Sequence, residues 1–497
     1  MIRRLAALLF LLALTAPLAA QKKEPAGKGA KQADPPARTG TVKVDGKNID
    51  FTVTAGKMEV KNDDGKTLAN IFHIIYRRKN TNLAKRPITF CYNGGPGSSS
   101  VWLHLGMLGP KRIKFPDDAK TLKPPYRLES NPHSLLDVTD LVFIDPVSTG
   151  FSRPAKGEKK SQFHGYSEDI RSVSQFVHDY LSKHNRWKSP KFLLGESYGG
   201  MRAAGMSGYL RQRYNIELNG VVLVSAAMNF QTLRFSTSND LPFVLFVPSF
   251  AATAWYHKAL PKDLQRLPLA TVVKRAERFA LGTYATALLR GTSLSAKERN
   301  AVATELARLT GLKRDYVLRS NLRVSMSRFG KELLRHRGQT IGRFDSRYTG
   351  QDRDGAGSRY EFDASGAAIF GPFTATINEY LRSVLKVKDH RVYEILTGNV
   401  FPWNYKNFAN RYVDSSESLR QAMAANEHLK VFIACGYYDL ATPPFSMQYT
   451  VNHLGLKPER LKNITTRFYE GGHMMYIHEP SMVKLRRDLL KFYDSSR

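Results

Sequence analysis

One serine lies where the chain could present it as a nucleophile. Ser197 is the centre of the pentapeptide G-E-S-Y-G, which follows the apolar run KFLL and precedes a segment with helical character, MRAAGMSGYLRQRY. Small residues two positions before and after a serine let the chain turn sharply from a strand into a helix, and the turn leaves the hydroxyl exposed. This context predicts that Ser197 attacks a carbonyl carbon of a substrate.

A nucleophilic serine needs a histidine to accept its proton and a carboxylate to orient that histidine. Asp439 follows the apolar run KVFIAC and His473 follows the run TTRFY, so both lie at predicted strand ends. The order serine, acid, histidine is the order found in folds with this type of turn. Asp414 and His478 are the alternatives, but two glycines precede His473 and free its loop to reach the serine. The predicted triad is Ser197, Asp439 and His473.

A glycine-rich loop, NGGPGSSS, spans residues 93–100 and also follows a predicted strand. It is not a phosphate-binding loop, because no Gly-Lys-Ser/Thr follows the glycines. Its three serines do not fit the turn pattern around Ser197. In folds with that turn, such a loop gives one backbone N–H to an oxyanion hole, and the residue after the nucleophile gives the other. This assigns Gly95, or its neighbour Gly94, together with Tyr198.

Six short apolar runs predict the strands that would position these residues. Several are nearly continuous in apolar side chains, which is typical of strands buried on both faces of a parallel sheet. The runs span residues 88–92, 141–145, 191–194, 221–225, 430–435 and 465–469. Helical patterns separate several of the runs. Alternating strands and helices predict an α/β fold with a doubly wound, mostly parallel sheet.

The alternation stops between residues 231 and 420, where helical segments dominate. Strand patterns return after residue 428, which favours an insertion into the sheet domain over an independent second domain. We therefore predict a core in two parts, residues 41–230 and 421–497. A mainly helical cap, residues 231–420, would cover one end of the sheet and shape the substrate pocket.

The first residues predict export. Arg3 and Arg4 precede the apolar stretch LAALLFLLALTAPLAA, so residues 1–20 have the pattern of a cleavable signal peptide. An N-terminal membrane anchor is the alternative, although Pro17 and the small residues suit cleavage better. Residues 21–40, rich in Lys, Gly, Ala and Pro, predict a disordered basic linker. No later stretch is long and charge-free enough to span a membrane, so the mature protein is predicted to be periplasmic or secreted.

The composition limits the partners. A formal net charge of +32 attracts nucleic acid and anionic surfaces without specificity. The chain has no zinc-finger spacing and no RNA-binding aromatic signature, so no specific nucleic-acid partner is expected.

Cys91 and Cys435 are too few for a disulfide scaffold and are expected to be small buried residues. Residues 352–363 match a calcium loop only in part, because Ala356 occupies the fifth position. No metal and no organic cofactor are expected.

Taken together, these residues resemble the serine carboxypeptidase family of α/β-hydrolases, in an exported form of bacterial type. The resemblance covers most of the chain outside the predicted signal and cap. It rests on NGGPGSSS (93–100), DPVSTGFSR (145–153), GESYGG (195–200), Asp439 before LATPP, and GGHM (471–474).

The resemblance implies an α/β-hydrolase fold, the triad named above, and an oxyanion hole formed by the N–H groups of Gly95 and Tyr198. It also implies that Asn93 and Glu196 bind the C-terminal carboxylate of a peptide substrate. A glutamate in contact with a carboxylate must share a proton with it, because two anions at contact repel. Peptide binding is therefore expected to be favoured at acidic pH.

Three positions depart from the family. Cys91 stands where the family usually has a tryptophan, Met107 stands where a second glutamate pairs with the first, and Ser98 replaces a common half-cystine. These changes leave the hydrolase chemistry intact but put strict exopeptidase specificity in doubt.

The predicted function is therefore a serine-type carboxypeptidase that acts on peptides through an acyl-enzyme. An esterase or acyltransferase on the same scaffold is the alternative, supported by Met107. A catalytically idle protein that binds anionic polymers is a third possibility, supported by the charge alone. Nothing in the sequence indicates an oligomeric state.

Overall fold

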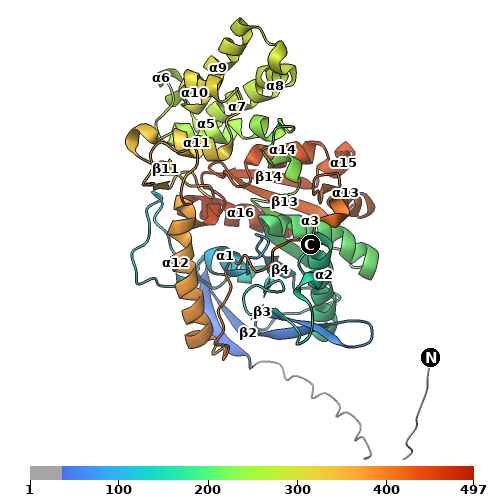
Figure 1. Cartoon of the computed structure of the whole chain (residues 1–497). Helices are drawn as coiled ribbons and strands as arrows, with labels where there is room; N and C mark the ends of the chain where they lie inside the picture. Colours follow the sequence, from blue (N-terminus) through green and yellow to red (C-terminus); the bar gives the residue numbers. More distant parts are fainter. Residues whose placement is uncertain (1–35) are drawn as a thin grey trace, which may run out of the picture. The chain divides into compact units, whose positions relative to one another are not determined.

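The computed structural model describes residues 36–497 (Figure 1). The predicted signal peptide, residues 1–20, and most of the predicted linker lie outside the described residues. The linker was predicted to end at residue 40, but strand β1 (Arg38–Val44) already begins at Arg38. Arg38 pairs with Val53 of the next strand, and its Nε donates to the carbonyl of Leu385 at 3.2 Å. These bonds order the backbone earlier than composition suggested.

A ten-stranded sheet runs through the described part of the chain in the order β1-β2-β3-β7-β4-β9-β10-β13-β14, with β8 paired to β3. Strands β1, β2, β3 and β7 pair in antiparallel fashion, and all pairs from β7 to β14 are parallel. The bounds are β2 Lys47–Lys61, β3 Thr67–Arg78, β4 Ile88–Tyr92, β7 Asp140–Ile144, β8 Arg153–Pro154, β9 Lys191–Glu196, β10 Gly220–Val224, β13 Lys430–Gly436 and β14 Ile464–Tyr469. The predicted mostly parallel sheet is confirmed, and its six predicted strands are all present.

Helices cover both faces of this sheet, so that each face has its own apolar core. On one face pack α2 (Tyr166–Lys183), α3 (Tyr198–Tyr214) and α13 (Ser416–Ala425). On the other face pack α1 (Val101–Leu103), α12 (Ala364–Glu379) and α16 (Glu479–Ser495), as Figure 1 shows. Strands β4, β9, β10 and β13 lie between the two layers and are almost wholly buried, which explains their continuous apolar sequences.

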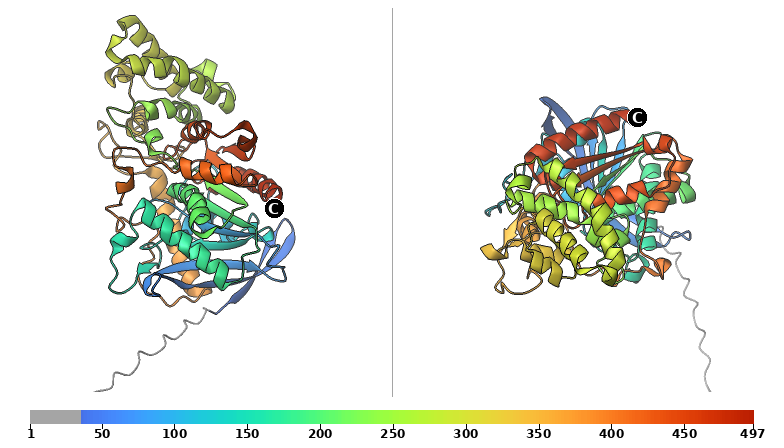
Figure 2. Two further views of the ribbon diagram at one scale, coloured as in Figure 1. Left: turned by 90° about the vertical axis from the view of Figure 1, so that its right-hand side faces the viewer. Right: turned by 90° about the horizontal axis from the view of Figure 1, so that it is seen from above.

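Between β10 and β13 the chain forms mainly helices. Those of residues 241–332 share a hydrophobic cluster of their own, which also takes in Leu440 from the loop after β13. They lie above the sheet in Figure 1 and in the left view of Figure 2. Their bounds are α4 Leu241–Leu245, α5 Val247–Tyr256, α6 Lys262–Gln265, α7 Leu269–Phe279, α8 Ala285–Arg290, α9 Ala296–Thr310, α10 Arg314–Arg319 and α11 Met326–Glu332. Helix α12, by contrast, packs in the apolar core that it shares with α1 and α16 on one face of the sheet.

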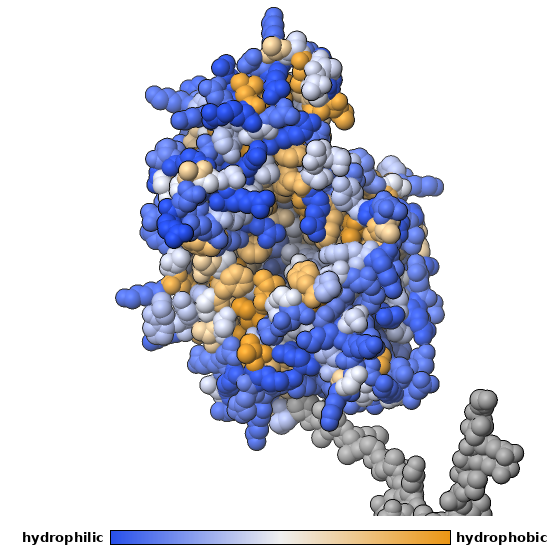
Figure 3. Space-filling view, in the orientation of Figure 1, coloured by the Kyte–Doolittle hydropathy of each residue, from blue (hydrophilic) through white to orange (hydrophobic). Residues whose placement is uncertain are grey.

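The surface between these upper helices and the sheet is hollowed, and apolar side chains gather beside the hollow (Figure 3). Within residues 36–497, none of the helices combines the length and apolar character that a bilayer crossing requires.

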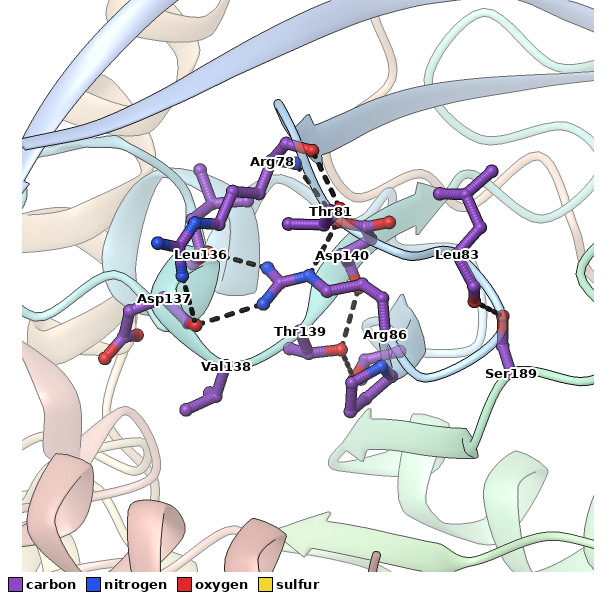
Figure 4. Close-up of polar contacts among 12 residues, drawn as sticks. Arg78, Thr81, Leu83, Arg86, Leu136, Asp137, Val138, Thr139, Asp140 and Ser189 are labelled. Carbon is purple, nitrogen blue, oxygen red and sulfur yellow. Dashed lines mark hydrogen bonds and ion pairs between the residues drawn. The ribbon is translucent and has the colours of Figure 1, made fainter.

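A buried ion cluster fastens the opposite, amino-terminal end of the parallel strands (Figure 4). Asp140, the first residue of β7, is fully buried. Its two carboxylate oxygens accept from Arg86 Nε at 3.1 Å and from Arg186 Nη1 at 2.7 Å, and the backbone N–H of Arg78 donates to it at 3.1 Å. Arg86 also donates to the carbonyls of Leu136 and Asp137. The cluster lies at the strand end away from Ser197, so its role is structural.

Asp140→Asn should destabilise the fold, because it leaves Arg86 and Arg186 buried beside a neutral side chain. We expect the free energy of unfolding to fall by about 3–5 kcal/mol, measured by chemical denaturation. Asp315→Asn is the matched control, since Asp315 pairs with Arg314 on the exposed surface and should change stability by about 1 kcal/mol or less. Equal losses in the two variants would show that the buried cluster has no special role.

Candidate active site

The turn at Ser197 joins strand β9 directly to helix α3. Glu196 ends the strand, Tyr198 begins the helix, and Ser197 between them has φ 61° and ψ −127°. A left-handed φ is unusual for a residue with a side chain and costs about 1–3 kcal/mol. The turn is held by hydrogen bonds from Ser197 N to the carbonyl of Val224 and from Gly200 N to that of Ser197. The backbone at Ser197 is therefore strained and fixed, as the G-x-S-x-G pattern predicted.

Glycine is required beside this turn because two backbone segments meet there. A Cβ at Gly195 would lie 2.0 Å from the carbonyl oxygen of Gly199. A Cβ at Gly94, in the loop after β4, would lie 2.4 Å from Tyr198 N and 2.7 Å from Gly199 N. The loop after β4 thus lies directly against the first N–H groups of α3. Its next residue, Gly95, has φ +101°, which a side chain would not tolerate.

Asp439 and His473 are brought together from the ends of adjacent strands β13 and β14. His473 Nδ1 lies 2.8 Å from Asp439 Oδ2, and both side chains are buried. Asp439 also accepts from the N–H groups of Ala441 and Thr442 and from the Thr442 hydroxyl, at 2.7–2.9 Å. Burial alone would lower the pKa of His473. The charge and hydrogen bond of Asp439, together with the charge of Glu196, raise that pKa above its ordinary value.

The two alternatives, Asp414 and His478, have local structural partners. Asp414 accepts from Asn229 Nδ2 at 3.1 Å and from Ser416 N at 2.8 Å, next to the start of α13. His478 Nδ1 lies 2.8 Å from the hydroxyl of Ser481, in the first turn of α16. These contacts tie both residues to helix ends.

The loop that carries His473 is held by a segment that the sequence did not single out. The backbone N–H of His473 donates to the carbonyl of Phe344 at 2.5 Å, and the N–H of Gly472 donates to Asp345 Oδ2 at 3.1 Å. Asp345 is buried and forms an ion pair with Arg347 at 2.7 Å. The ring of Phe344 also lies 5.3 Å from that of His473, centroid to centroid. Residues 344–347 therefore fix both the backbone and the ring of His473.

The three serines of the glycine-rich loop have structural partners. Ser98 Oγ donates to the carbonyl of Ile395 and accepts from Trp102 Nε1 at 2.7 Å. Ser100 donates to Asp145 Oδ1 through its hydroxyl and its backbone N–H, both at 2.9 Å. Ser99 is fully buried, and its backbone N–H donates to the carbonyl of Ile395 at 3.1 Å. The side chains of Ser98 and Ser100 and the backbone of Ser99 fasten the loop to its surroundings, and the backbone of Gly94 and Gly95 remains on the side of Ser197.

Glu196 is buried beside the triad residues, and a tyrosine contacts it. The hydroxyl of Tyr476 donates to Glu196 Oε2 at 2.6 Å. Burial raises the pKa of Glu196 to about 7, although the charge of His473 and hydrogen bonds from Tyr476 and Asn93 lower it in part. Glu196 is therefore protonated in a large fraction of molecules at neutral pH.

Tyr476, not a second glutamate, contacts Glu196. Its ring packs against Gly106, where a Cβ would lie 2.6 Å from Tyr476 Cε2. Met107 is buried, with its side chain in the apolar core. Sequence reasoning missed Tyr476, although it follows His473 by only three residues, because no motif links it to Glu196.

Cys91, the other departure, is a buried core residue. Burial raises the pKa of its thiol well above the ordinary value, and the thiol donates weakly to the carbonyl of Thr89. Cys435 is also buried and free of any disulfide. Both cysteines are unreactive small core residues.

Asn93, Glu196, Ser197 and His473 open onto one pocket of about 350 Å³. It lies at the carboxyl ends of β4, β9 and β14. The rest of its lining is largely apolar and comes in part from α12 and from the segment before β13: Gly94, Gly95, Pro96, Ser98, Trp102, Arg343, Phe344, Ile369, Phe370, Leu396, Thr397, Gly398, Phe401 and Met474.

Within residues 36–497, no three His, Cys, Asp or Glu side chains converge as a metal site would require. In the partial calcium loop, Lys331 Nζ bonds Asp352 Oδ2 at 2.5 Å and also contacts the carbonyl of Asp354. An ammonium group thus occupies the place that a cation would need there.

Comparison with known proteins confirms the predicted resemblance. Residues 43–263, less than half of the chain, match the serine carboxypeptidase family. A serine carboxypeptidase from Dictyostelium discoideum is 30% identical over 153 residues, and serine carboxypeptidase-like 7 from Arabidopsis thaliana is 32% identical over 191 residues. The aligned parts cover 30% and 36% of this chain but only 33% and 40% of those relatives.

The similarity in fold to a solved carboxypeptidase covers more of the chain than the similarity in sequence does. Kex1, a prohormone-processing carboxypeptidase from Saccharomyces cerevisiae, superposes with a TM-score of 0.56 at 16% sequence identity. The superposition covers 89% of this chain and 91% of Kex1. The fold is that of an α/β-hydrolase, as predicted.

Gly94→Ala should disturb the contact between the loop after β4 and the start of α3, because the new methyl would overlap two backbone nitrogens. We expect the free energy of unfolding to fall by about 1–3 kcal/mol in chemical denaturation. Gly282→Ala is the control. A Cβ at Gly282 meets nothing within 4 Å, so this change should be neutral or stabilise by up to about 1 kcal/mol. Similar unfolding midpoints for both variants would contradict the close approach.

Proposed function

We propose that this chain is a serine hydrolase that removes C-terminal residues from peptides. The observation that carries the proposal is the hydrogen bond between His473 and Asp439, in one pocket with the strained Ser197. The family match and the fold likeness to a carboxypeptidase support the choice of reaction.

In the proposed reaction, Ser197 Oγ attacks the carbonyl carbon of the last peptide bond while His473 takes the hydroxyl proton. Asp439 keeps the imidazole oriented and stabilises its positive charge. The N–H groups of Gly95 and Tyr198 receive the oxyanion, and His473 then gives its proton to the departing amine. Water, activated in the same way, releases the peptide from Ser197. The chemistry uses residues of this chain and needs no metal or organic cofactor.

Asn93 and Glu196 receive the substrate's C-terminal carboxylate in this proposal. A protonated Glu196 can donate a hydrogen bond to a carboxylate, whereas an ionised Glu196 would repel it. Burial raises the pKa of Glu196, and the charge of His473 and the hydroxyl of Tyr476 lower it in part. In this proposal, Glu196 and the substrate's C-terminal carboxylate share one proton.

The remaining parts of the proposal concern organisation. We propose that residues 231–420 form a cap on a core of residues 41–230 and 421–497, because helices 241–332 share a separate cluster. We also propose export to the periplasm or the medium, on the basis of the signal pattern in residues 1–20.

An esterase or acyltransferase remains the second candidate, because a tyrosine rather than a carboxylate contacts Glu196. N-blocked dipeptides, their C-terminal amides and their methyl esters separate the two functions. A carboxypeptidase should hydrolyse the free acid with a kcat/KM about 10²-fold or more above that of the amide, since the amide cannot take the shared proton in the same way.

Ser197→Ala provides the control for every substrate. We expect it to lose fluorophosphonate labelling and to lower kcat by about 10⁴-fold or more, whereas Ser98→Ala should still label. Equal labelling of the wild type and Ser197→Ala would overturn the hydrolase proposal. Rapid ester cleavage with no preference for the free acid would favour the esterase.

The protonation of Glu196 predicts a pH dependence of KM. Below pH 7, Glu196 is mainly protonated and KM for a free-acid peptide should be constant. Above pH 7, KM should rise by about tenfold per pH unit as the protonated fraction falls. Tyr476→Phe removes a hydrogen bond that lowers the pKa of Glu196, so the rise should begin at higher pH in that variant.

Glu196→Gln is the matched control for this profile. Its amide donates a hydrogen bond at any pH, so KM should no longer change around pH 7. A wild-type KM that stays level from pH 5 to pH 9 would exclude Glu196 as the proton-sharing group.

A further inference from the structure

One cation lines the pocket without a carboxylate partner. Among the described residues that line the pocket, Arg343 carries the positive charge of a lysine or arginine side chain, and most of the others are apolar. Its backbone N–H donates to Asp363, but no acidic side chain in residues 36–497 pairs with its guanidinium. The guanidinium lies over the ring of Phe344, 5.2 Å from its centroid.

Two other arginines close to Arg343 in the sequence, one buried and one half-buried, are neutralised. Arg347, four residues away, is paired with Asp345 at 2.7 Å, and Arg323 is paired with Asp240 at 2.6 Å. Arg343 is half-buried and keeps its charge open to the pocket. A guanidinium over an aromatic ring is held there by cation–π attraction and can still donate N–H groups to a planar anion.

Arg343 lies on the side of the pocket that holds His473. It follows directly from the segment that bonds the His473 loop, since the next residue, Phe344, accepts the N–H of His473. Its charge lowers the pKa of His473, whereas the main influences on Glu196 come from burial, His473, Tyr476, Asp439 and Asn93. Arg343 thus gives the pocket lining a second polar group that can bind a carboxylate, besides Asn93 and Glu196.

We propose that Arg343 forms an anionic subsite that receives the acidic side chain of a substrate residue next to the scissile bond. This rests on the proposed function, in which Asn93 and Glu196 take the C-terminal carboxylate. A glutamate or aspartate side chain would place its methylene carbons on the apolar lining, which includes Trp102 and Phe370, and its carboxylate on the guanidinium.

The test compares N-blocked dipeptides that carry Glu, Gln or Lys on either side of the scissile bond. At one of these two positions the wild type should prefer Glu over Gln by about tenfold or more in kcat/KM. Arg343→Gln should bring this ratio close to one, and Arg343→Glu should reverse it in favour of Lys. Arg319→Gln, at an exposed position outside the pocket, should keep the wild-type ratio.

The same peptides, titrated calorimetrically into the Ser197→Ala protein, test the subsite even if hydrolysis fails. There the Glu peptide should bind about tenfold more tightly than the Gln peptide, and Arg343→Gln in the same background should remove the difference. Peptides that bind in this way but are not cleaved by the wild type would overturn the proposed function and keep the subsite.

Two results would overturn the subsite. The first is a ratio of Glu to Gln near one at both positions in the wild type, or a ratio that survives Arg343→Gln. The second is a loss of the preference for free acid over amide in Arg343→Gln without any effect of Glu against Gln, because Arg343 would then bind the C-terminal carboxylate instead.

Discussion

The hydrogen bond between His473 and Asp439 lies in the buried interior, so the surrounding structure must supply the hydrogen bonds that water would otherwise make to both side chains. A buried ionised carboxylate is expensive unless several donors surround it. Here the turn after β13 supplies two N–H groups and one hydroxyl to Asp439, so the carboxylate needs only the imidazole to complete its shell. The imidazole is fixed in turn through the Phe344 carbonyl and ring. The geometry of the Asp439–His473 pair therefore depends on three segments far apart in the sequence.

The same burial that strengthens this hydrogen bond acts on Glu196. In a site with little water, a carboxylate with few partners keeps its proton, and Tyr476 supplies only one hydrogen bond. Glu196 has a phenol rather than a second carboxyl group in contact with it, and its proton equilibrium is coupled to that of His473, whose charge lowers the pKa of Glu196. With Met107 where the resemblance places a second glutamate, and with Tyr476 in contact with Glu196, the pocket has one carboxyl group fewer than the resemblance implies.

The sequence predicted the parts of this site that depend on local pattern. Parallel strands buried on both faces have continuous apolar runs, so β4, β7, β9, β10, β13 and β14 could be found, together with the residues at their ends. Strands β1, β2 and β3 were not among the predicted strands. In β2, burial varies from residue to residue, which gives a weaker signal. Strand β3 is buried without a break from Ile71 to Tyr76, so its apolar run was overlooked rather than absent.

The partners of the site residues could not be found in this way. Tyr476 contacts Glu196 across 280 residues of sequence, and Phe344 and Asp345 reach the His473 loop from a helical region without a motif. Arg343 was one basic residue among 75 lysines and arginines, and only its position in the pocket distinguishes it. The roles of Ser98 and Ser100 as anchors likewise depend on Ile395 and Asp145, which only the folded chain brings near.

The contact between residues 344–347 and the His473 loop has a consequence for protein engineering and for evolution. In many enzymes an insertion above the sheet can be exchanged as a module without harm to the reacting groups. In this chain Phe344 and Asp345, which lie in the proposed cap, accept the backbone N–H groups of His473 and Gly472. A graft that replaces the whole insertion would remove these two acceptors. Recombination within this architecture is therefore restricted to the outer helices, and residues 343–347 must be inherited together with the loop they support.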